Sequence, residues 1–206
     1  YNSGIVRATG GNLYSSAVGA RAIVNMGEME LKFKRNCGIH GEGEVAVLNY
    51  ATLMYGSISG SAPLIDGSFK IGVENNQQMV MRQGNISASI DGIKNHGDLE
   101  IYGGASHGRR GVNALAGSLV LGGKVTIPSI YLASGQIVHV AGGVDINGGL
   151  LCPDDYYEGR VLVRSDIEDA DFNMKQFRLE PKNPYRMQSA GKKLYITVIR
   201  YIVEFD

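Results

Sequence analysis

Short runs of alternating apolar and polar residues follow one another along the chain, and glycines separate them. The clearest run lies within residues 91–127, where one stretch contains, in order, Ile93, Gly97, Asp98, Leu99 and Ile101. Alternation with a period of two predicts β-strands, because successive side chains of a strand point to opposite sides. The glycines predict tight turns, where the backbone needs freedom that other residues lack.

This run belongs to a repeat of the form apolar-x-x-x-Gly-(Asp/Glu)-apolar-x-apolar. Three stretches match it in full: Ile23–Leu31, Ile39–Val47 and Ile93–Ile101. Looser copies begin near Ile65, Gly84, Val112 and Val138. The spacing between copies varies, which excludes a rigid hexapeptide or leucine-rich period and indicates coils of unequal length.

The repeat predicts an all-β protein, an irregular parallel β-helix (β-solenoid) over residues 1–149. Strands stacked in parallel about 4.8 Å apart would join the apolar pairs of successive copies into one column. The pairs are Met29 with Leu31, Val45 with Val47, Leu99 with Ile101, and Val125 with Ile127. Asn25 and Asn95 occupy the same template position and predict a short stack of asparagines.

An antiparallel β-sandwich is the competing fold, because short strands with frequent turn signals also describe that class. The solenoid is favoured, since the Asp-Gly and Asn-Gly pairs mostly lie at the edges of the repeat and not between matched strands.

Residues 150–206 differ in composition and are expected to form a C-terminal β-rich cap. They contain three of the five prolines, and residues 159–164, 177–180 and 193–205 have the pattern of strands. Ser165–Glu168 has the form of a helix capping box and predicts a short helix, with a carboxylate-rich loop as the alternative. A solenoid needs its open apolar end covered, which gives this segment its expected role.

Composition narrows the possible partners. The 20 basic residues balance the 20 acidic ones, so the net charge does not indicate nucleic-acid binding, which depends on a basic surface. No apolar run reaches 18 residues, so no membrane-spanning segment is expected. A start at Tyr1, without Met or a signal-peptide core, is expected of a processed product or an excised fragment.

The two cysteines, Cys37 and Cys152, have no partner at metal-ligand spacing. They bracket about five coils, which would place them about 20 Å apart in a straight solenoid. That distance exceeds the limit of about 7 Å between the Cα atoms of a disulfide. The sequence therefore predicts two free, buried thiols.

The phrase GIKNHGDLEIYGG resembles a motif of exported parallel β-helix proteins of bacteria, a pectate-lyase-like superfamily with carbohydrate-binding members. The resemblance extends over about residues 22–149. The tail is similar to segments that close solenoids in bacterial surface proteins, and residues 201–206 resemble the opening strand of internalin-type B-repeats. The resemblance implies an exported, cell-surface or extracellular module cut from a longer protein.

For an enzyme of this superfamily, the resemblance implies a calcium-binding carboxylate cluster and an Arg or Lys base. Asp91, Asp98 and Glu100 are the nearest candidates, and we interpret them as solvated rim charges. No cofactor is expected, although calcium remains open, and no catalytic residue is assigned.

Two segments are candidate ligand-binding sites. The first contains His107, Arg109 and Arg110, whose guanidinium groups suit a uronate or a sulfate. The second combines carboxylates with aromatic rings, as calcium-assisted sugar sites do: Asp154, Asp155, Tyr156 and Tyr157. For the first segment the alternative is an exposed loop with incidental charge, and for the second it is a turn-forming hydrophilic loop of the cap. The double change Arg109→Ala with Arg110→Ala is expected to leave folding intact.

The leading functional hypothesis is a non-catalytic module for adhesion or glycan binding at a bacterial surface, with a polysaccharide or a host or surface protein as partner. A polysaccharide lyase or hydrolase acting on acidic glycans is the first alternative. A trimeric phage fibre tip is the second, and the sequence itself sets no oligomeric state.

Overall fold

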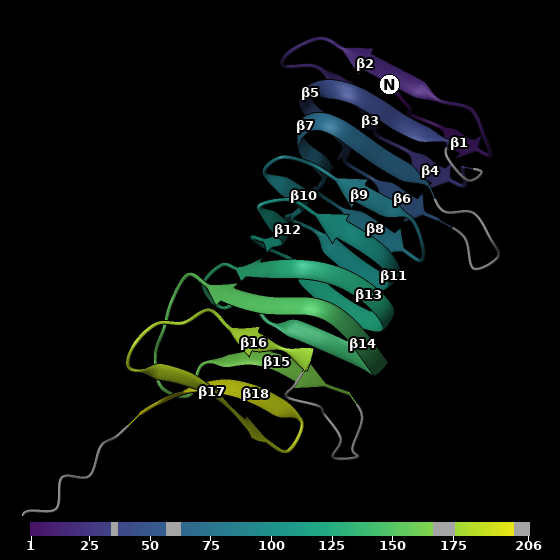
Figure 1. Ribbon diagram of the computed structural model, residues 1–206. Coiled ribbons are helices and arrows are strands. Elements are labelled where there is room, and N and C mark those ends of the chain that lie inside the picture. Colours follow the sequence, from purple (N-terminus) through teal and green to yellow (C-terminus); the bar gives the residue numbers. More distant parts are fainter. Residues whose placement is uncertain (34–36, 57–62, 167–175, 200–206) are drawn as a thin grey trace, which may run out of the picture.

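The computed structural model describes residues 1–33, 37–56, 63–166 and 176–199. They form a parallel β-solenoid of about 7 turns with a β-hairpin across its C-terminal end (Figure 1). The all-β solenoid with a C-terminal β-rich cap that the sequence predicts is therefore confirmed.

Each coil passes through three faces, which we call A, B and C. Face A stacks β1 (Ile5–Ala8), β4 (Glu28–Leu31), β6 (Thr52–Tyr55), β8 (Gln78–Met81), the first parts of β11 (Asp98–His107), β13 (Ser118–Leu132) and β14 (Val138–Pro153), and β15 (Val161–Ser165). Face B stacks β2 (Leu13–Ser16), the first parts of β5 (Gly38–Asn49) and β7 (Leu64–Asn75), β9 (Asn85–Ser87), and the later parts of β11, β13 and β14. Face C stacks β3 (Arg21–Asn25), the ends of β5 and β7, β10 (Asp91–Asn95), β12 (Arg110–Ala114), the ends of β13 and β14, and β16 (Arg178–Leu179).

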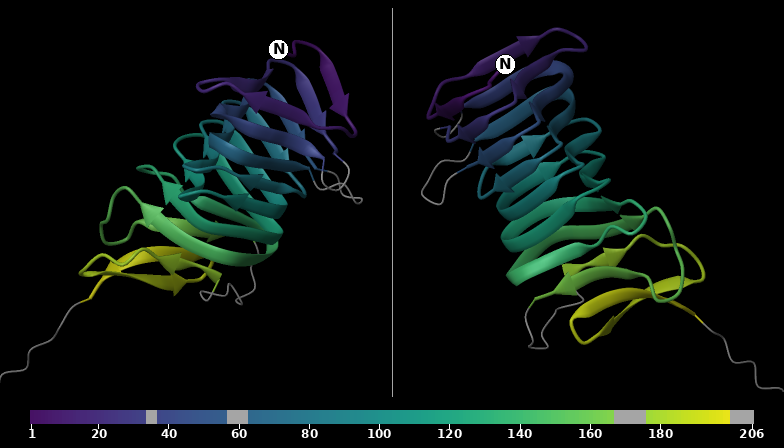
Figure 2. Two further views of the ribbon diagram at one scale, coloured as in Figure 1. Left: turned by 45° about the horizontal axis from the view of Figure 1, so that its top comes forward. Right: turned by 180° about the vertical axis from the view of Figure 1, so that it is seen from behind.

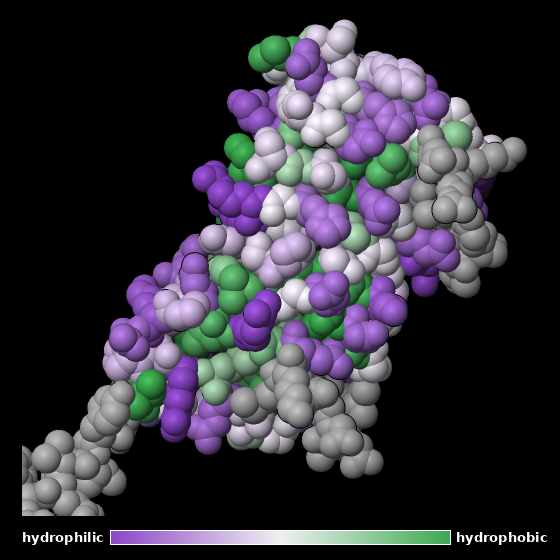
Figure 3. Space-filling model, viewed as in Figure 1, coloured by the Kyte–Doolittle hydropathy of each residue, from purple (hydrophilic) through white to green (hydrophobic). Residues whose placement is uncertain are grey.

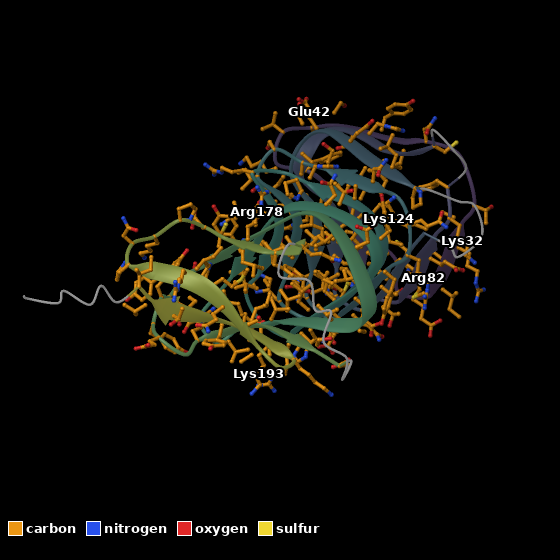
Figure 4. The ribbon with its side chains drawn as sticks, turned by 60° about the horizontal axis from the view of Figure 1, so that its bottom comes forward. Lys32, Glu42, Arg82, Lys124, Arg178 and Lys193 are labelled. Atoms are coloured by element: carbon orange, nitrogen blue, oxygen red, sulfur yellow. The ribbon has the colours of Figure 1, made fainter. Side chains whose placement is uncertain are left out.

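Apolar side chains from all three faces fill the interior of the coils. On face A one column consists of Met29, Leu53, Met79, Leu99, Leu119, Val138 and Val163, all at most 5% exposed. Burying one such side chain contributes roughly 1.5–3 kcal/mol, but only when coils lie on both sides of it. Charged side chains such as Lys32, Glu42 and Arg82 lie around the outside (Figure 4).

The repeat template identifies the strands, but it matches two different corners of the coil. Ile23–Leu31 and Ile93–Ile101 both run from face C into face A, whereas Ile39–Val47 runs from face B into face C. Both corners need a glycine followed by an alternating strand, so the same template fits each. The four apolar pairs are buried as predicted. They are distributed over three faces of one core, however, so the expectation of a single column was wrong.

Two glycines show why the corners require this residue. A Cβ atom on Gly97 would lie 2.0 Å from the carbonyl oxygen of Gln77 in the preceding coil. At Gly67 the Cβ would lie 2.0 Å from the Gly41 carbonyl oxygen, and φ is +111°. Close stacking of coils, together with positive φ in some turns, selects glycine.

Five asparagines form a buried ladder at the corner between faces C and A: Asn2, Asn25, Asn49, Asn75 and Asn95. The Nδ2 of each of the first four donates to the Oδ1 of the next asparagine at 2.7–2.8 Å. The ladder ends where Ala114 follows Asn95 in register. The predicted asparagine stack is confirmed and is longer than the two members that the sequence indicated.

The C-terminal end of the solenoid is covered by the hairpin of β17 (Tyr185–Ala190) and β18 (Lys193–Val198) (Figures 1 and 2). β18 pairs antiparallel with β15, and its Leu194 and Ile196 are fully buried. β14 runs through Gly149 without a break, and parallel pairing continues into β15 and β16. Stacking therefore extends beyond the expected boundary at residue 149.

Three strand-like runs of the tail coincide with β15, β16 and β18, although β18 ends at Val198. The predicted helix after Ser165 and the last residues of the chain lie outside the described residues. Both cysteines are free, as predicted. Cys152 is buried, whereas Cys37 is only partly buried.

Candidate functional site

The register of face C aligns one side chain per coil in a column along the solenoid. We call it the face C column, and it consists of Glu74, Lys94, Asn113, Tyr131, Cys152 and Glu180. Neighbouring members lie on adjacent parallel strands, which are about 4.8 Å apart. Lys94 donates to Glu74 at 2.9 Å, so the N-terminal part of the column is internally paired.

Asp91 anchors an arginine beside this column. Its carboxylate is almost completely buried and accepts two hydrogen bonds from Arg110, Nε to Oδ1 at 2.5 Å and Nη2 to Oδ2 at 3.0 Å. Asn113 Nδ2 adds a third bond to Oδ2 at 3.2 Å. Such a fork fixes the plane of the guanidinium. The interpretation of Asp91 as a solvated rim charge was therefore wrong, because the side chain is needed to balance Arg110.

Arg110 in turn lies over the ring of Tyr131, with Cζ 5.5 Å from the ring centroid. Tyr131 is partly exposed, and Arg109 is exposed beside it. Within the described part of the chain, the Arg109 side chain has no hydrogen-bond or ion-pair partner. A cation fixed over an aromatic ring next to a free cation can bind a ligand that has both an apolar face and an anionic or hydroxyl group.

Cys152 continues the column next to Tyr131. Burial and the nearby Glu180 carboxylate raise the pKa of its thiol from 9.0 to about 11, while a hydrogen bond with Tyr131 opposes the shift. The thiol is consequently protonated at neutral pH, and the thiolate that would act as a nucleophile is scarce. Cys152 is buried, so it contributes an uncharged position beneath the surface and no nucleophile.

A second aromatic cluster lies at the C-terminal end of the column. The Tyr156 hydroxyl donates to the Glu180 carbonyl oxygen at 3.3 Å, and its ring lies 5.5 Å from that of Tyr185. Lys182 Nζ is 4.4 Å from the Tyr156 ring centroid. Burial, followed by the charge of Glu180, raises the pKa of Tyr156 to about 12, so the hydroxyl remains a donor at neutral pH.

Asp155 has a structural partner that the sequence did not indicate. Its carboxylate forms an ion pair with Arg160, a side chain that is 2% exposed. Ser134 Oγ donates to the same carboxylate at 2.9 Å, and Arg160 Nη2 donates to the Ala133 carbonyl at 3.2 Å. Asp155 thus holds the turn at residues 133–136 against the following loop.

The other predicted ligand residues lie around these two clusters. His107 ends β11 on face B, in register with Ser87, so a corner separates it from Arg110. Asp154 and Tyr157 are exposed, and 53% of Tyr157 is accessible. The structure thus brings Arg109, Arg110 and Tyr156 to one face and leaves His107 on another.

Sequence reasoning missed Tyr131, Glu180 and Lys182. Each of them is at least 21 residues away in sequence from the predicted segment that it lies next to in space. Only the register of the coils reveals that they are close. A possible signal is the alternation in SIYLA, which marks Tyr131 as the residue opposite to the buried Ile130 and Leu132.

Asp98 and Glu100 share a strand of face A, where Asp98 accepts from Ser118 at 2.7 Å. Among the described residues, no three His, Cys, Asp or Glu side chains come together as a metal site requires. The described part of the chain also contains no helix that could cross a membrane.

On the face shown in Figure 3, hydrophobic residues form small patches between polar ones and no single broad apolar area. Comparison of the chain with protein-family models, curated proteins and solved structures gave no match. Fold and geometry therefore carry the functional argument, and the resemblance to exported bacterial β-helix proteins stays a prediction.

Proposed function

We propose that this protein is a non-catalytic glycan-binding module that uses the outside of face C. The observation that carries the proposal is the Asp91–Arg110–Tyr131 arrangement, in which a buried carboxylate fixes a guanidinium over a partly exposed ring. Sugars have apolar C–H faces that stack on aromatic rings and hydroxyl groups that need directed donors and acceptors.

The length of the surface supports an extended ligand. The Tyr156 cluster lies beside Glu180, two coils beyond Tyr131 in the face C column, which corresponds to about 10 Å. Tyr131 and Tyr156 therefore provide two aromatic positions along one face, with Arg109 and Lys182 as adjacent cations. A chain of sugar units can contact both, whereas a single unit cannot.

A flat, rigid sheet suits binding more than catalysis. We assign no catalytic residue: Arg110 is held by Asp91, and the Cys152 thiol is protonated at neutral pH. Location at a bacterial surface remains part of the proposal, on the strength of the sequence resemblance alone.

A glycan array probed with the intact protein tests the proposal, followed by calorimetric titration of the selected oligosaccharide. Tyr131→Ala should weaken binding at least about tenfold, the loss of one stacking contact of about 1.4 kcal/mol. Tyr50→Ala is the matched control, because Tyr50 is 49% exposed and lies in a coil of the N-terminal half. An array without any binder, or equal loss in both variants, would refute glycan binding at face C.

Two further measurements examine the alternatives. Release of unsaturated products from polygalacturonate in the presence of calcium would identify a lyase. A stable trimer in light scattering would support a fibre tip, although each coil here completes its core within a single chain.

A further inference from the structure

The two ends of the solenoid differ. Leu194 and Ile196 of the hairpin cover the C-terminal end, whereas the N-terminal end exposes residues that belong to the core columns. Val6 is 38% exposed although its register partner Met29 is 5% exposed. Leu13 is 40% exposed although its partner Ile39 is fully buried.

These residues border a cavity of about 420 Å³ at the N-terminal end, and its walls include side chains of the first complete coils. The larger apolar ones are Val6, Leu13, Ile23, Met29, Leu31 and Phe33. A cavity of this size holds several apolar side chains, and its apolar walls lose stabilisation while water occupies it. An occupant would fill it by inserting side chains between the faces, as every coil of the solenoid does.

Gly4 shows where the backbone of that occupant would run. Gly27 follows Gly4 in the same corner column, and a Cβ on Gly27 would lie 2.3 Å from the Gly4 carbonyl oxygen. Gly117 stands in the same relation to Gly97, at 2.0 Å. At Gly27 and Gly117 the glycine thus makes room for a carbonyl of the preceding coil, whereas two other coils have Ala51 and Gln77 at this position. A Cβ on Gly4 would meet nothing within 4 Å in the described structure.

Asn2 provides an independent indication. The Oδ1 of Asn25 accepts both the ladder amide of Asn2 at 2.8 Å and the Gly27 N–H at 3.3 Å. The Oδ1 of Asn2 accepts only the Gly4 N–H, at 3.0 Å, among the described residues. Asn2 is nevertheless only 8% exposed, so its second acceptor position suits a further amide of the ladder.

We propose that the N-terminal end accepts one further solenoid coil, stacked in parallel on β3, β2 and β1 and running into Tyr1. The direction follows from the register, because Asn2 forms a parallel bridge with Asn25 and its N–H donates to the Val24 carbonyl at 2.9 Å. A strand over β3 must therefore be continuous with Tyr1. A second copy related by a two-fold axis would present antiparallel strands, and these do not continue either the asparagine ladder or the parallel stacking of coils at the Gly4 corner.

The protein contains a segment suited to a test. Residues Asn75–Lys94 form one complete coil and directly precede Asn95, which occupies the ladder position equivalent to Asn2. If a copy of this coil is fused to the N-terminal side of Asn2, replacing Tyr1, it supplies a ladder asparagine and four core side chains. The added coil also places a copy of Asp91 in register with Arg21 of the next coil. In the protein itself, Asp91 is in register with Arg110 of the next coil in the same way.

The extended protein should show a Tm at least about 2–4 °C above that of the original. Hydrogen exchange of amides in β1, β2 and β3 should slow at least about tenfold. The control is the same extension with serine at the positions of Met79, Met81, Ile86 and Ile93, which should leave Tm and exchange unchanged. Equal behaviour of the two extensions would overturn the proposal.

Sedimentation velocity of the original protein tests the competing occupant. A monomer is expected over the accessible concentrations. A dimer that Leu13→Lys dissociates would show that a second copy covers this end, and the proposal of a further coil would be wrong.

Discussion

The Asp91–Arg110 pair connects the interior of the solenoid with its outer surface. Asp91 is 2% exposed, whereas the Arg110 side chain is 31% exposed and lies over Tyr131. The carboxylate has lost its hydration on burial, and the hydrogen bonds from Arg110 and Asn113 replace it. Arg110 has a structural role in addition to its proposed contact with ligand.

Arg110→Ala should lower the free energy of unfolding by about 3 kcal/mol, because it leaves the buried Asp91 without its counter-charge. Urea denaturation measures the effect, and Arg109→Ala is the matched control, with a change within about 0.5 kcal/mol. The expectation that both arginines can be removed without effect on folding is therefore revised. If Asp91→Leu combined with Arg110→Met is no more stable than Arg110→Ala, the unpaired charge is not the cause.

Alkaline pH should destabilise the protein through Cys152 and Tyr156. Burial and Glu180 raise their pKa values to about 11 and about 12, so the folded state retains both protons at pH values where the unfolded chain releases them. This contribution is complete below about pH 9 and is lost as the pH rises from about 9 through 12. Cys152→Ala with Tyr156→Phe should show a flatter decline of stability over that range. Parallel curves for the two proteins would contradict the assignment.

At the level of elements, the sequence predicted strands, corners and the cap, but it did not predict the register. Local alternation and glycines determine where a strand begins and ends, and both are visible in residues 93–101. Which strands stack on one another depends on the length of each coil, and this length varies. The copy that begins at Ile39 was therefore aligned with the other two although it spans a different corner. For the same reason the sequence did not show that Tyr131 lies next to Arg110 or that Glu180 lies next to Tyr156.

The asparagine ladder is the element that fixes this register. Asn75 occupies a middle position, donates to Asn95 at 2.7 Å and accepts from Asn49 at 2.8 Å. Asn75→Ala should cost about 1–3 kcal/mol, because it removes the two buried ladder hydrogen bonds that join Asn75 to Asn49 and Asn95. Asn147→Ala is the control at an exposed position outside the ladder. Thermal unfolding measures the difference, and equal Tm values would show that the ladder contributes no stability.

Close stacking at the corner makes Gly97→Ala destabilising. The new Cβ would overlap the Gln77 carbonyl, which belongs to the backbone and can move only with its coil. We expect a loss of about 2 kcal/mol or more in chemical denaturation. Gly143→Ala is the matched control, since nothing lies within 4 Å of its Cβ position. A loss at Gly143 as large as that at Gly97 would exclude coil contact as the cause.

At the scale of the whole molecule, the solenoid is a rigid scaffold whose faces present residues from distant parts of the chain at fixed spacing. Its core is continuous from β4 to the hairpin, so the outer side chains of face C hold their positions without ligand. This preorganisation reduces the entropy lost on binding and supports a recognition role for the surface around Tyr131 and Tyr156.

The most direct test of the account is the footprint of a bound oligosaccharide on the protein, measured by backbone amide chemical shifts during titration. We expect shifts confined to face C, in β12, β16, the ends of β13 and β14, and the loop that carries Tyr156. Shifts centred on face A or face B, or a saturating titration that leaves the Tyr131 and Arg110 amides unchanged, would contradict it.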